Sequence, residues 1–284
     1  MAHATNPQAD EILDREFKCL NAGFVRLIDY MGGDESIVQA ARVSYGKGTK
    51  SVNEDRGLIR YLMRHLHTPP FEMVELKFHV KLPIFVARQW IRHLTANVNE
   101  YSGRYSVMKD EFYVPSADTI HFQSQKNKQG RDETEVPAET RQQIIDELLS
   151  EQTTSYSNYE KFLELNIARE LARINLPLSL YTEWYWKIDL HNLFHFLRLR
   201  LDEHAQFEIR VYADAMAEIT KHVAPIAYEA FEDYILHSEK FSRLEMNVLK
   251  TLLSKKDFTD EELSQFGLGK REAEEFREKM KRLV

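Results

Sequence analysis

The feature that most constrains the fold is an alternating segment that runs directly into a helical pattern. Between residues 74 and 82, apolar residues alternate with polar ones, in the order Val74, Glu75, Leu76, Lys77, Phe78, His79, Val80, Lys81, Leu82. This period of two is typical of a strand with one buried face. Pro83 suits the first turn of a helix, and Val86 and Trp90 then stand four residues apart. The sequence therefore predicts a strand followed at once by a helix.

Polar side chains crowd the segment that follows. Residues 88–105 read RQWIRHLTANVNEYSGRY. Arginine offers a planar fork of donors that fits phosphate, while amide and hydroxyl groups can read the edge of a nucleobase. Gln89, Arg92 and His93 have helical spacing, so we expect one helix edge to carry them toward a ligand. After Leu94 the pattern is polar and aperiodic, which predicts a binding loop where Gly103 permits close backbone approach.

Composition limits the classes of partner. Lys and Arg number 38 and Asp and Glu 45, which gives a net charge of −7, so binding of polymeric nucleic acid through bulk charge is not expected. There is no apolar run long enough to span a membrane and no signal-peptide pattern. The single cysteine, Cys19, excludes an internal disulfide. These features favour a cytoplasmic protein.

The chain divides into three parts in this interpretation. Residues 1–22 form an N-terminal arm, 23–238 the catalytic domain, and 239–284 a C-terminal helical extension that resembles a hairpin. Within the domain we expect a strand at 23–31, helices at 36–43 and 58–65, and long helices at about 138–166 and 205–238. The loop at 116–137 is expected to border the site. The aromatic residues of 181–186 are expected in the core.

Familiar nucleotide fingerprints are missing. GKGTKS at 46–51 lacks the spacing of a P-loop, and no GxGxxG follows a strand. A second polar cluster, KIDLHNLFHFLRLRLDEH, places His191 and His195 four residues apart on one helix face. Without an HExxH motif this pair does not predict a metal site, and taken alone it is more typical of hydrogen-bonded structural histidines.

The segment ARQWIRHLTANVNEYSGRY resembles the signature of the flavin-dependent thymidylate synthases. That motif runs Arg-His-Arg, seven residues, then Ser, and here it is matched by Arg92, His93, Leu94 and Ser102. The resemblance continues through AARVSYGKG, HTPPFE, FHVKLPIFVARQW, ARINLPLSLYTEWYWKIDLHNLFHFLRLR and HAQFEIR, from residue 23 to 235. It implies an α+β single-domain fold with an antiparallel sheet, long helices and a C-terminal helical extension. It also implies a homotetramer with FAD sites between subunits.

The resemblance implies a reaction as well. In this reaction 5,10-methylenetetrahydrofolate supplies a one-carbon unit to C5 of dUMP, and NADPH supplies reducing equivalents through FAD. The product is dTMP. Classical thymidylate synthases instead use a cysteine nucleophile in an electropositive pocket. Cys19 lies in the polar arm without such a site, so we do not expect it to be catalytic.

Site residues follow from the motif matches. The dUMP contacts implied are Gln89, Arg92, Glu100, Tyr101, Ser102, Gly103, Arg104, Arg173 from another subunit, and Arg200. The FAD contacts implied are Pro69, Arg92, His93, Leu94, Glu100, Asp189, His191 and His195. Arg200 is the expected catalytic residue, because a cation near N3 and O2 of uracil stabilises the developing anion. Ser102 is expected to be a ligand, since no adjacent base would activate it as a nucleophile.

Two positions depart from the motif. Leu94 replaces its second arginine, and Pro69 stands where a hydroxyl residue is common. Loss of one charged hydrogen bond costs about 1.5–3 kcal/mol, or roughly one to two decades of affinity. Three interpretations of Leu94 are open: an adapted variant compensated by His191 and His195, an engineered or decayed site, or a residue that packs in the apolar helix pattern. An NADPH-oxidising flavoprotein and a non-enzymatic nucleotide-binding protein remain alternatives.

Overall fold

The computed structural model describes residues 5–43, 52–125, 130–252 and 259–283. The GKGTKS segment lies outside the described residues. Contacts divide the chain into two compact units, Met1–Leu236 and His237–Val284. None of the described helices combines the length and the apolar character needed to cross a membrane.

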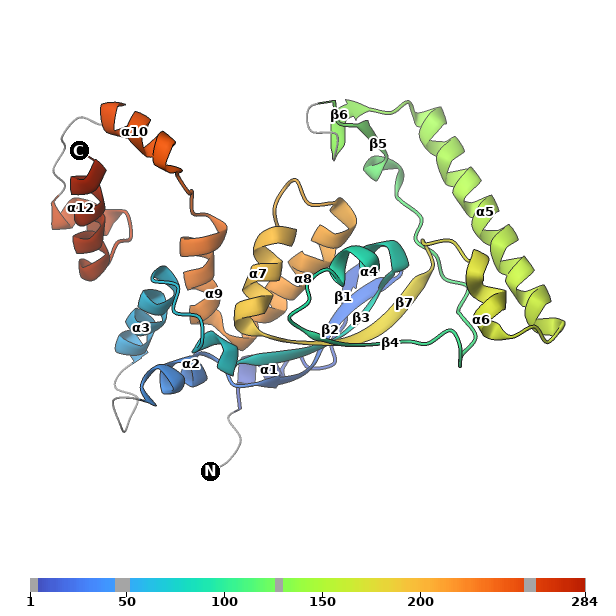
Figure 1. The fold of residues 1–284 in the computed structure, drawn as a ribbon, viewed down its shortest axis with the longest axis horizontal. Helices are drawn as coiled ribbons and strands as arrows, with labels where there is room; N and C mark the ends of the chain where they lie inside the picture. The colour runs from blue at the N-terminus through green and yellow to red at the C-terminus, as the bar shows by residue number, and fades with distance from the viewer. Residues whose placement is uncertain (1–4, 44–51, 126–129, 253–258, 284) are drawn as a thin grey trace. The chain divides into compact units, whose positions relative to one another are not determined.

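A five-stranded antiparallel sheet is the centre of the first unit (Figure 1). Its strands lie in the order β1 (Phe17–Cys19), β2 (Gly23–Met31), β3 (Glu75–Pro83), β7 (Tyr181–Asp189) and β4 (Asn97–Glu100). The predicted strands at 23–31 and 74–82 are confirmed as β2 and β3. β3 pairs with β7 along its whole length, from Glu75 opposite Asp189 to Pro83 opposite Tyr181. The mixture of this sheet with helices confirms the α+β class.

The helices of this unit come from several parts of the chain. They are α1 (Pro7–Asp10), α2 (Asp34–Ala41), α3 (Val52–Arg64), α4 (Ile84–Trp90), α5 (Ala138–Glu164), α6 (Arg169–Ala172), α7 (Leu190–Arg200), α8 (Phe207–Val223) and α9 (Pro225–Phe231). Short turns of helix lie at Phe71–Met73, Ala117–Thr119, Arg173–Asn175 and Glu232–Leu236. The single helix predicted for 205–238 is wrong. Ala224 leaves the helical conformation, and Pro225, which has no N–H to donate, begins α9.

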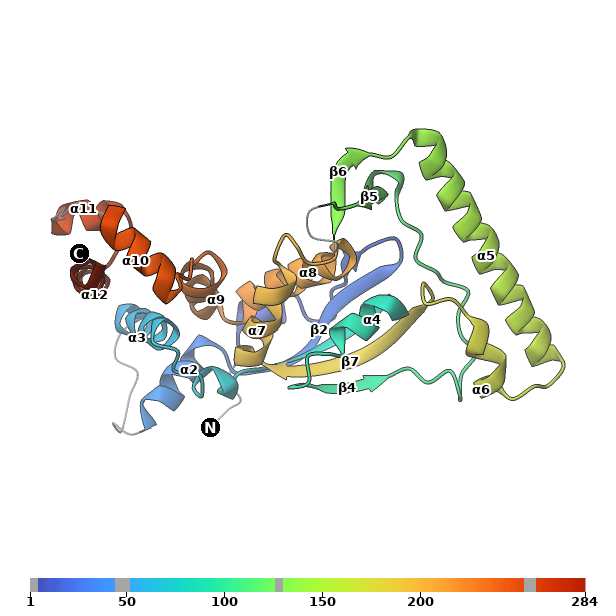
Figure 2. The ribbon, with the colours of Figure 1, turned by 45° about the horizontal axis from the view of Figure 1, so that its top comes forward.

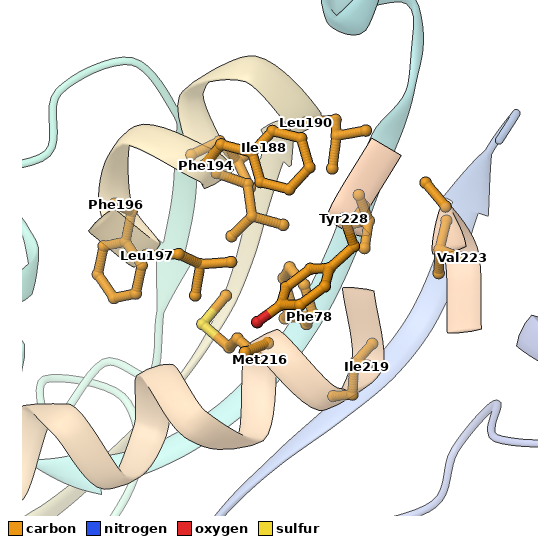
Figure 3. Close-up of a cluster of buried hydrophobic side chains, with 14 of the residues drawn as sticks. Phe78, Ile188, Leu190, Phe194, Phe196, Leu197, Met216, Ile219, Val223 and Tyr228 are labelled. Atoms are coloured by element: carbon orange, nitrogen blue, oxygen red, sulfur yellow. The ribbon is translucent and has the colours of Figure 1, made fainter. Parts of the chain in front are cut away.

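One face of the sheet carries the core. Helices α4, α7 and α8 lie on this face (Figure 2). Phe78 from β3 and Ile188 from β7 meet side chains of α7, α8 and α9, including Phe194, Met216 and Tyr228 (Figure 3). The apolar residues of the alternating pattern in β3 face these helices, but the strand is not half-buried as predicted, because His79 and Lys81 on its other face are buried too. The other face carries ion pairs such as Lys187 with Glu75 at 2.8 Å.

Trp90 joins α4 to this core. Its ring is fully buried, 5.6 Å from Trp184, 5.3 Å from Trp186 and 4.8 Å from Phe196 between ring centroids. The core position expected for the aromatic run of β7 is confirmed for Tyr181, Trp184 and Trp186. Tyr185 is the exception, because it points to the other face and remains exposed.

The segment 1–22, read from the sequence as a polar arm, contributes to the sheet. It contains α1 and β1, and β1 pairs with β2 through Cys19 opposite Gly23. Cys19 is buried, and this burial raises the pKa of its thiol to about 12. A thiol that stays protonated at neutral pH is a poor nucleophile, so the structure gives a physical reason against a catalytic role.

The loop predicted for 116–137 contains an antiparallel pair, β5 (His121–Gln123) and β6 (Arg131–Glu135). The second unit contains α10 (Arg243–Leu252), α11 (Asp260–Gln265) and α12 (Lys270–Leu283). The predicted hairpin is wrong in one respect, because a third helix, α11, is present. Thr259 and Glu262 form a capping box at its start, a local signal that the hairpin interpretation overlooked.

Candidate functional site

The turn after α4 places the first group of site residues. Helix α4 ends at Trp90, and the N–H of His93 donates to the carbonyl of Trp90 at 3.0 Å. The predicted helix edge is therefore wrong: Gln89 lies on α4, while Arg92 and His93 lie in the turn beyond it. Burial of Trp90 fixes the last turn, and the chain must then leave the core to reach the sheet edge.

The loop predicted after Leu94 includes a strand. Asn97–Glu100 forms β4 and pairs with the edge of β7, with all four side chains exposed. Because neither face is buried, no apolar alternation announces this strand. The carboxylate of Glu100 accepts a hydrogen bond from the Thr182 hydroxyl at 2.9 Å. The N–H of Tyr101 extends the pairing to the carbonyl of Glu183 at 2.8 Å.

Arg200 and His93 form the most informative contact of the site. The Nε of Arg200 donates to Nε2 of His93 at 3.1 Å. Burial, with the charge of Arg200 and the neighbouring His195, lowers the pKa of His93 to about 4. A guanidinium can only donate, so the His93 imidazole is neutral and carries its proton on Nδ1. Within the described part of the chain, the terminal nitrogens of Arg200 form no hydrogen bond or ion pair.

Helix α7 supplies the neighbours of this pair. The ring of His195 lies 6.0 Å from that of His93, and burial and the charge of Arg198 lower the pKa of His195. His191 is half-buried one turn earlier. Asp189 is the N-cap of α7, accepting from the backbone and side-chain nitrogens of Asn192 at 2.9 and 2.7 Å. Its carboxylate thus has a structural role whether or not it binds a ligand.

A second group of cations gathers beyond β4. A Cβ placed on Gly103 would come within 3.1 Å of the Arg173 guanidinium and 2.6 Å of the Met108 sulfur, so any larger residue would require these side chains to move. The resemblance placed Arg173 on another subunit, but in this chain it lies beside Gly103. Arg104 is exposed and paired with Glu170 at 3.0 Å. The N–H of Arg104 also reaches the Ser102 hydroxyl at 3.4 Å.

Leu94 and Pro69 both face solvent. Leu94 is 85% exposed, so the interpretation in which it packs in the apolar pattern of a helix is wrong. The cause is the end of α4 at Trp90, which removes Leu94 from that pattern. Pro69 is exposed in the turn before Phe71–Met73, where its carbonyl accepts from the N–H of Glu72 at 3.2 Å.

Strand β4 lies between the two groups along the chain (Figure 2). The turn with His93 precedes it and the loop of Ser102, Gly103 and Arg104 follows it. Four extended residues cover roughly 13 Å at about 3.3 Å each. The structure therefore brings together His93, His195 and Arg200 as one group, and Gly103 and Arg173 as a second. Among the described residues, no group of His, Cys, Asp and Glu is placed to hold a metal ion.

Sequence reasoning missed three residues that hold site residues. Gln206 accepts from Gln89 at 3.0 Å, Glu208 accepts from Gln206 at 2.9 Å, and Glu170 pairs with Arg104. Gln206 and Glu208 belong to HAQFEIR, which carried part of the resemblance. Nothing local could link this segment to Gln89, because 117 positions separate Gln206 from it.

Comparisons with known proteins show which proteins this chain is similar to. The family model described as Thymidylate synthase complementing protein matches residues 26–226. A flavin-dependent thymidylate synthase of Ehrlichia ruminantium (strain Gardel) is 57% identical over 94% of this chain and 88% of its own length. One of Treponema denticola is 57% identical over 95% and 98%. The structure of the UMP/dUMP methylase PolB from Streptomyces cacaoi with 5-Br UMP has a TM-score of 0.69 and 32% identity, and covers 76% of this chain and 96% of that one.

The low pKa of His93 is open to direct measurement. We expect NMR titration of the chain to give His93 an apparent pKa near 4. Arg200→Met should raise this pKa but leave it below the ordinary value of about 6.5, because burial is the larger cause. Between pH values of about 4 and about 6.5, His93 binds more protons in the unfolded chain than in the folded chain. The free energy of unfolding should therefore fall as pH falls through this range.

Arg88→Met, which removes an exposed cation from α4, is the control and should leave the His93 titration unchanged. A pKa of His93 near 6.5 in the unaltered chain would contradict the burial of its ring beside the charge of Arg200.

Proposed function

The chain belongs to the Thymidylate synthase complementing protein family, and from this premise we propose which of its residues perform each part of the reaction. The activity is that of a flavin-dependent thymidylate synthase, the reductive methylation of dUMP to dTMP. The carbon comes from 5,10-methylenetetrahydrofolate, and bound FAD supplies reducing equivalents taken from NADPH. The observation that carries the residue-level proposal is the geometry of Arg200.

Arg200 activates the pyrimidine. Its Nε is held by His93 at 3.1 Å, which fixes the plane of the guanidinium and leaves its terminal nitrogens for a ligand. A fixed cation beside a uracil oxygen stabilises the negative charge that develops in the ring when C5 becomes nucleophilic. A neutral His93 can accept this bond, whereas a protonated one would repel Arg200. His93 is therefore a positioning residue for Arg200 as well as a surface for the flavin.

The loop beyond β4 holds the phosphate of dUMP. Ser102, the backbone at Gly103, Arg104 and Arg173 offer donors, and Gly103 permits the close approach that its contacts require. Arg104 forms an ion pair with Glu170 at 3.0 Å. Binding of phosphate to this exposed arginine would replace the Glu170 carboxylate with a doubly charged anion. Arg92, Gln89, Glu100 and Tyr101 complete the proposed dUMP contacts.

The proposed FAD residues fit a flavin in their chemistry. His93 and His195 form a neutral aromatic surface, and burial lowers the pKa of both. Arg92 is exposed and cationic, which suits an anionic pyrophosphate. Pro69, Glu100, Asp189 and His191 are the other proposed contacts. Leu94 is exposed in the same turn but offers no donor.

Two copies of the chain are needed to complete a site. Arg200 lies at the end of α7 and Ser102 in the loop after β4, and the resemblance implies that different subunits contribute to one site. Exposed apolar side chains available for assembly lie in the last turn of α5 and in the segment after it, namely Phe162, Leu165, Ile167, Leu171, Ile174 and Leu178. We therefore propose a homotetramer with the FAD sites between subunits, in the cytoplasm.

Removal of the Arg200 cation tests its catalytic role. We expect Arg200→Met to lower dUMP-dependent release of tritium from C5 of the pyrimidine about 10²- to 10³-fold, the usual cost of one charge-stabilising donor. FAD absorbance should persist, since Arg200 is not among the flavin contacts. Arg198→Met, on the same helix, is the matched control. Undiminished tritium release by Arg200→Met would refute its role in activation.

The exposed position of Leu94 makes its replacement informative. Leu94→Arg should tighten FAD binding by roughly one to two decades, because it adds one charged hydrogen bond. Leu94→Met controls for a change of side chain without charge and should leave the FAD dissociation constant unchanged. If both variants bind FAD like the unaltered chain, residue 94 lies outside the flavin site.

The assembly proposal predicts a particle of four 33.5 kDa chains by light scattering. Leu171→Glu and Ile174→Glu should dissociate it and abolish tritium release, because charges would replace exposed apolar contacts. Phe266→Glu alters an equally exposed side chain of the second unit and should leave the tetramer intact. A flavin-bound monomer of the unaltered chain would contradict the proposal.

A further inference from the structure

A chain of hydrogen bonds leads from a buried carboxylate to Gln89. Glu208 is only 3% exposed and accepts three donors. The Tyr113 hydroxyl donates to its Oε1 at 2.9 Å, Arg131 of β6 pairs with the same oxygen, and Nε2 of Gln206 donates to Oε2 at 2.9 Å. Oε1 of Gln206 in turn accepts from Nε2 of Gln89 at 3.0 Å.

The ionised carboxylate gives this chain a direction. Burial raises the pKa of Glu208, but the Gln206 hydrogen bond and the charge of Arg131 outweigh it, so the net pKa is lowered. An ionised carboxylate can only accept, whereas an amide can turn either end toward a partner. Glu208 therefore requires the nitrogen of Gln206. The oxygen of Gln206 then faces Gln89, which must donate a hydrogen bond from its own nitrogen.

The consequence falls on the oxygen of Gln89. Its Oε1 is shielded from solvent and finds no hydrogen-bond donor among the residues that the structure describes. A shielded acceptor without a donor is unfavourable, and the side chain as a whole is only half-buried. The amide orientations that Glu208 imposes thus leave the Oε1 of Gln89 without a donor, and Gln89 belongs to the proposed dUMP site.

We propose that Glu208, acting through Gln206, is a positioning residue that fixes Gln89 as a hydrogen-bond acceptor for a donor of the substrate. This inference rests on the proposed dUMP site. The phosphate dianion has no donor, so Gln89 does not serve the phosphate. The two donors of dUMP are the 3′-hydroxyl of the sugar and N3–H of the base, and Gln89 selects one of them. Arg131 anchors the same carboxylate to the β5–β6 hairpin.

Glu208→Gln should reverse the chain of amides. The new amide keeps its oxygen toward Arg131, which only donates, and so presents nitrogen to Gln206. Gln206 then turns its oxygen toward residue 208 and its nitrogen toward Gln89, whose own nitrogen is left for the substrate. One substitution of similar shape would thereby convert Gln89 from an acceptor into a donor.

The affinities of dUMP analogues test whether Gln89 acts as an acceptor. Dissociation constants of dUMP, 2′,3′-dideoxy-UMP and N3-methyl-dUMP would be measured by calorimetry for the unaltered chain, Gln89→Leu, Glu208→Gln and Tyr113→Phe. In the unaltered chain the analogue that lacks the recognised donor should bind about tenfold more weakly than dUMP. That penalty should disappear in Gln89→Leu and Glu208→Gln. Tyr113→Phe removes a donor to Glu208 without touching Gln206 and should keep the penalty.

Thermal unfolding of each variant separates misfolding from altered recognition. If Glu208→Gln does not fold, Gln206→Leu replaces it. Gln206→Leu should also lose the penalty. Persistence of the penalty in the folded Glu208 or Gln206 variant overturns the inference. Equal binding of all three nucleotides by the unaltered chain also overturns it, but leaves the proposed dUMP site standing. Failure of the unaltered chain to bind dUMP would instead refute the dUMP site itself.

Discussion

The packing of Trp90 is the constraint on which the site depends. Its ring lies against Trp184 and Trp186 of β7 and against Phe196 of α7, so one side chain holds a helix, a strand and a second helix together. Gln89 precedes it and His93 follows it by three residues. Phe196 lies on the helix that ends with Arg200. Burial of a large aromatic surface therefore fixes the relative positions of the groups that we propose to contact the base and the flavin.

Groups with a single hydrogen-bonding role give that framework its chemistry. Arg200 can only donate, so His93 must be neutral and accept, and the low pKa of His93 follows from the same contact and from burial. Glu208 can only accept, so Gln206 and Gln89 take defined orientations. In both cases a charged group that can only donate, or only accept, determines which hydrogen-bonding role its neighbour takes, because the neighbour can do either. The site is thus preorganised by polarity as well as by shape.

Prediction from the sequence was good where the signal was local. Strands β2 and β3, the buried residues of β7 and the motif around Arg92 and Ser102 were all recognisable from short patterns. Prediction was poor where a distant partner decided the outcome. Strand β4 forms because β7 offers an open edge, Arg104 meets Glu170, and Cys19 joins a strand instead of an arm. Leu94 lies outside the helix because α4 ends when Trp90 is buried.

The sequence by itself determined the family, the antiparallel α+β character and the set of polar side chains available for a nucleotide and a flavin. Periodicity and motif spacing are properties of neighbouring residues, so they survive without the fold. Which of these side chains meet depends on the three-dimensional fold. It joined Arg200 to His93 and Gln89 to Gln206. Such contacts arise because burial of the core sets the distances between segments far apart in the chain, and no local pattern encodes those distances.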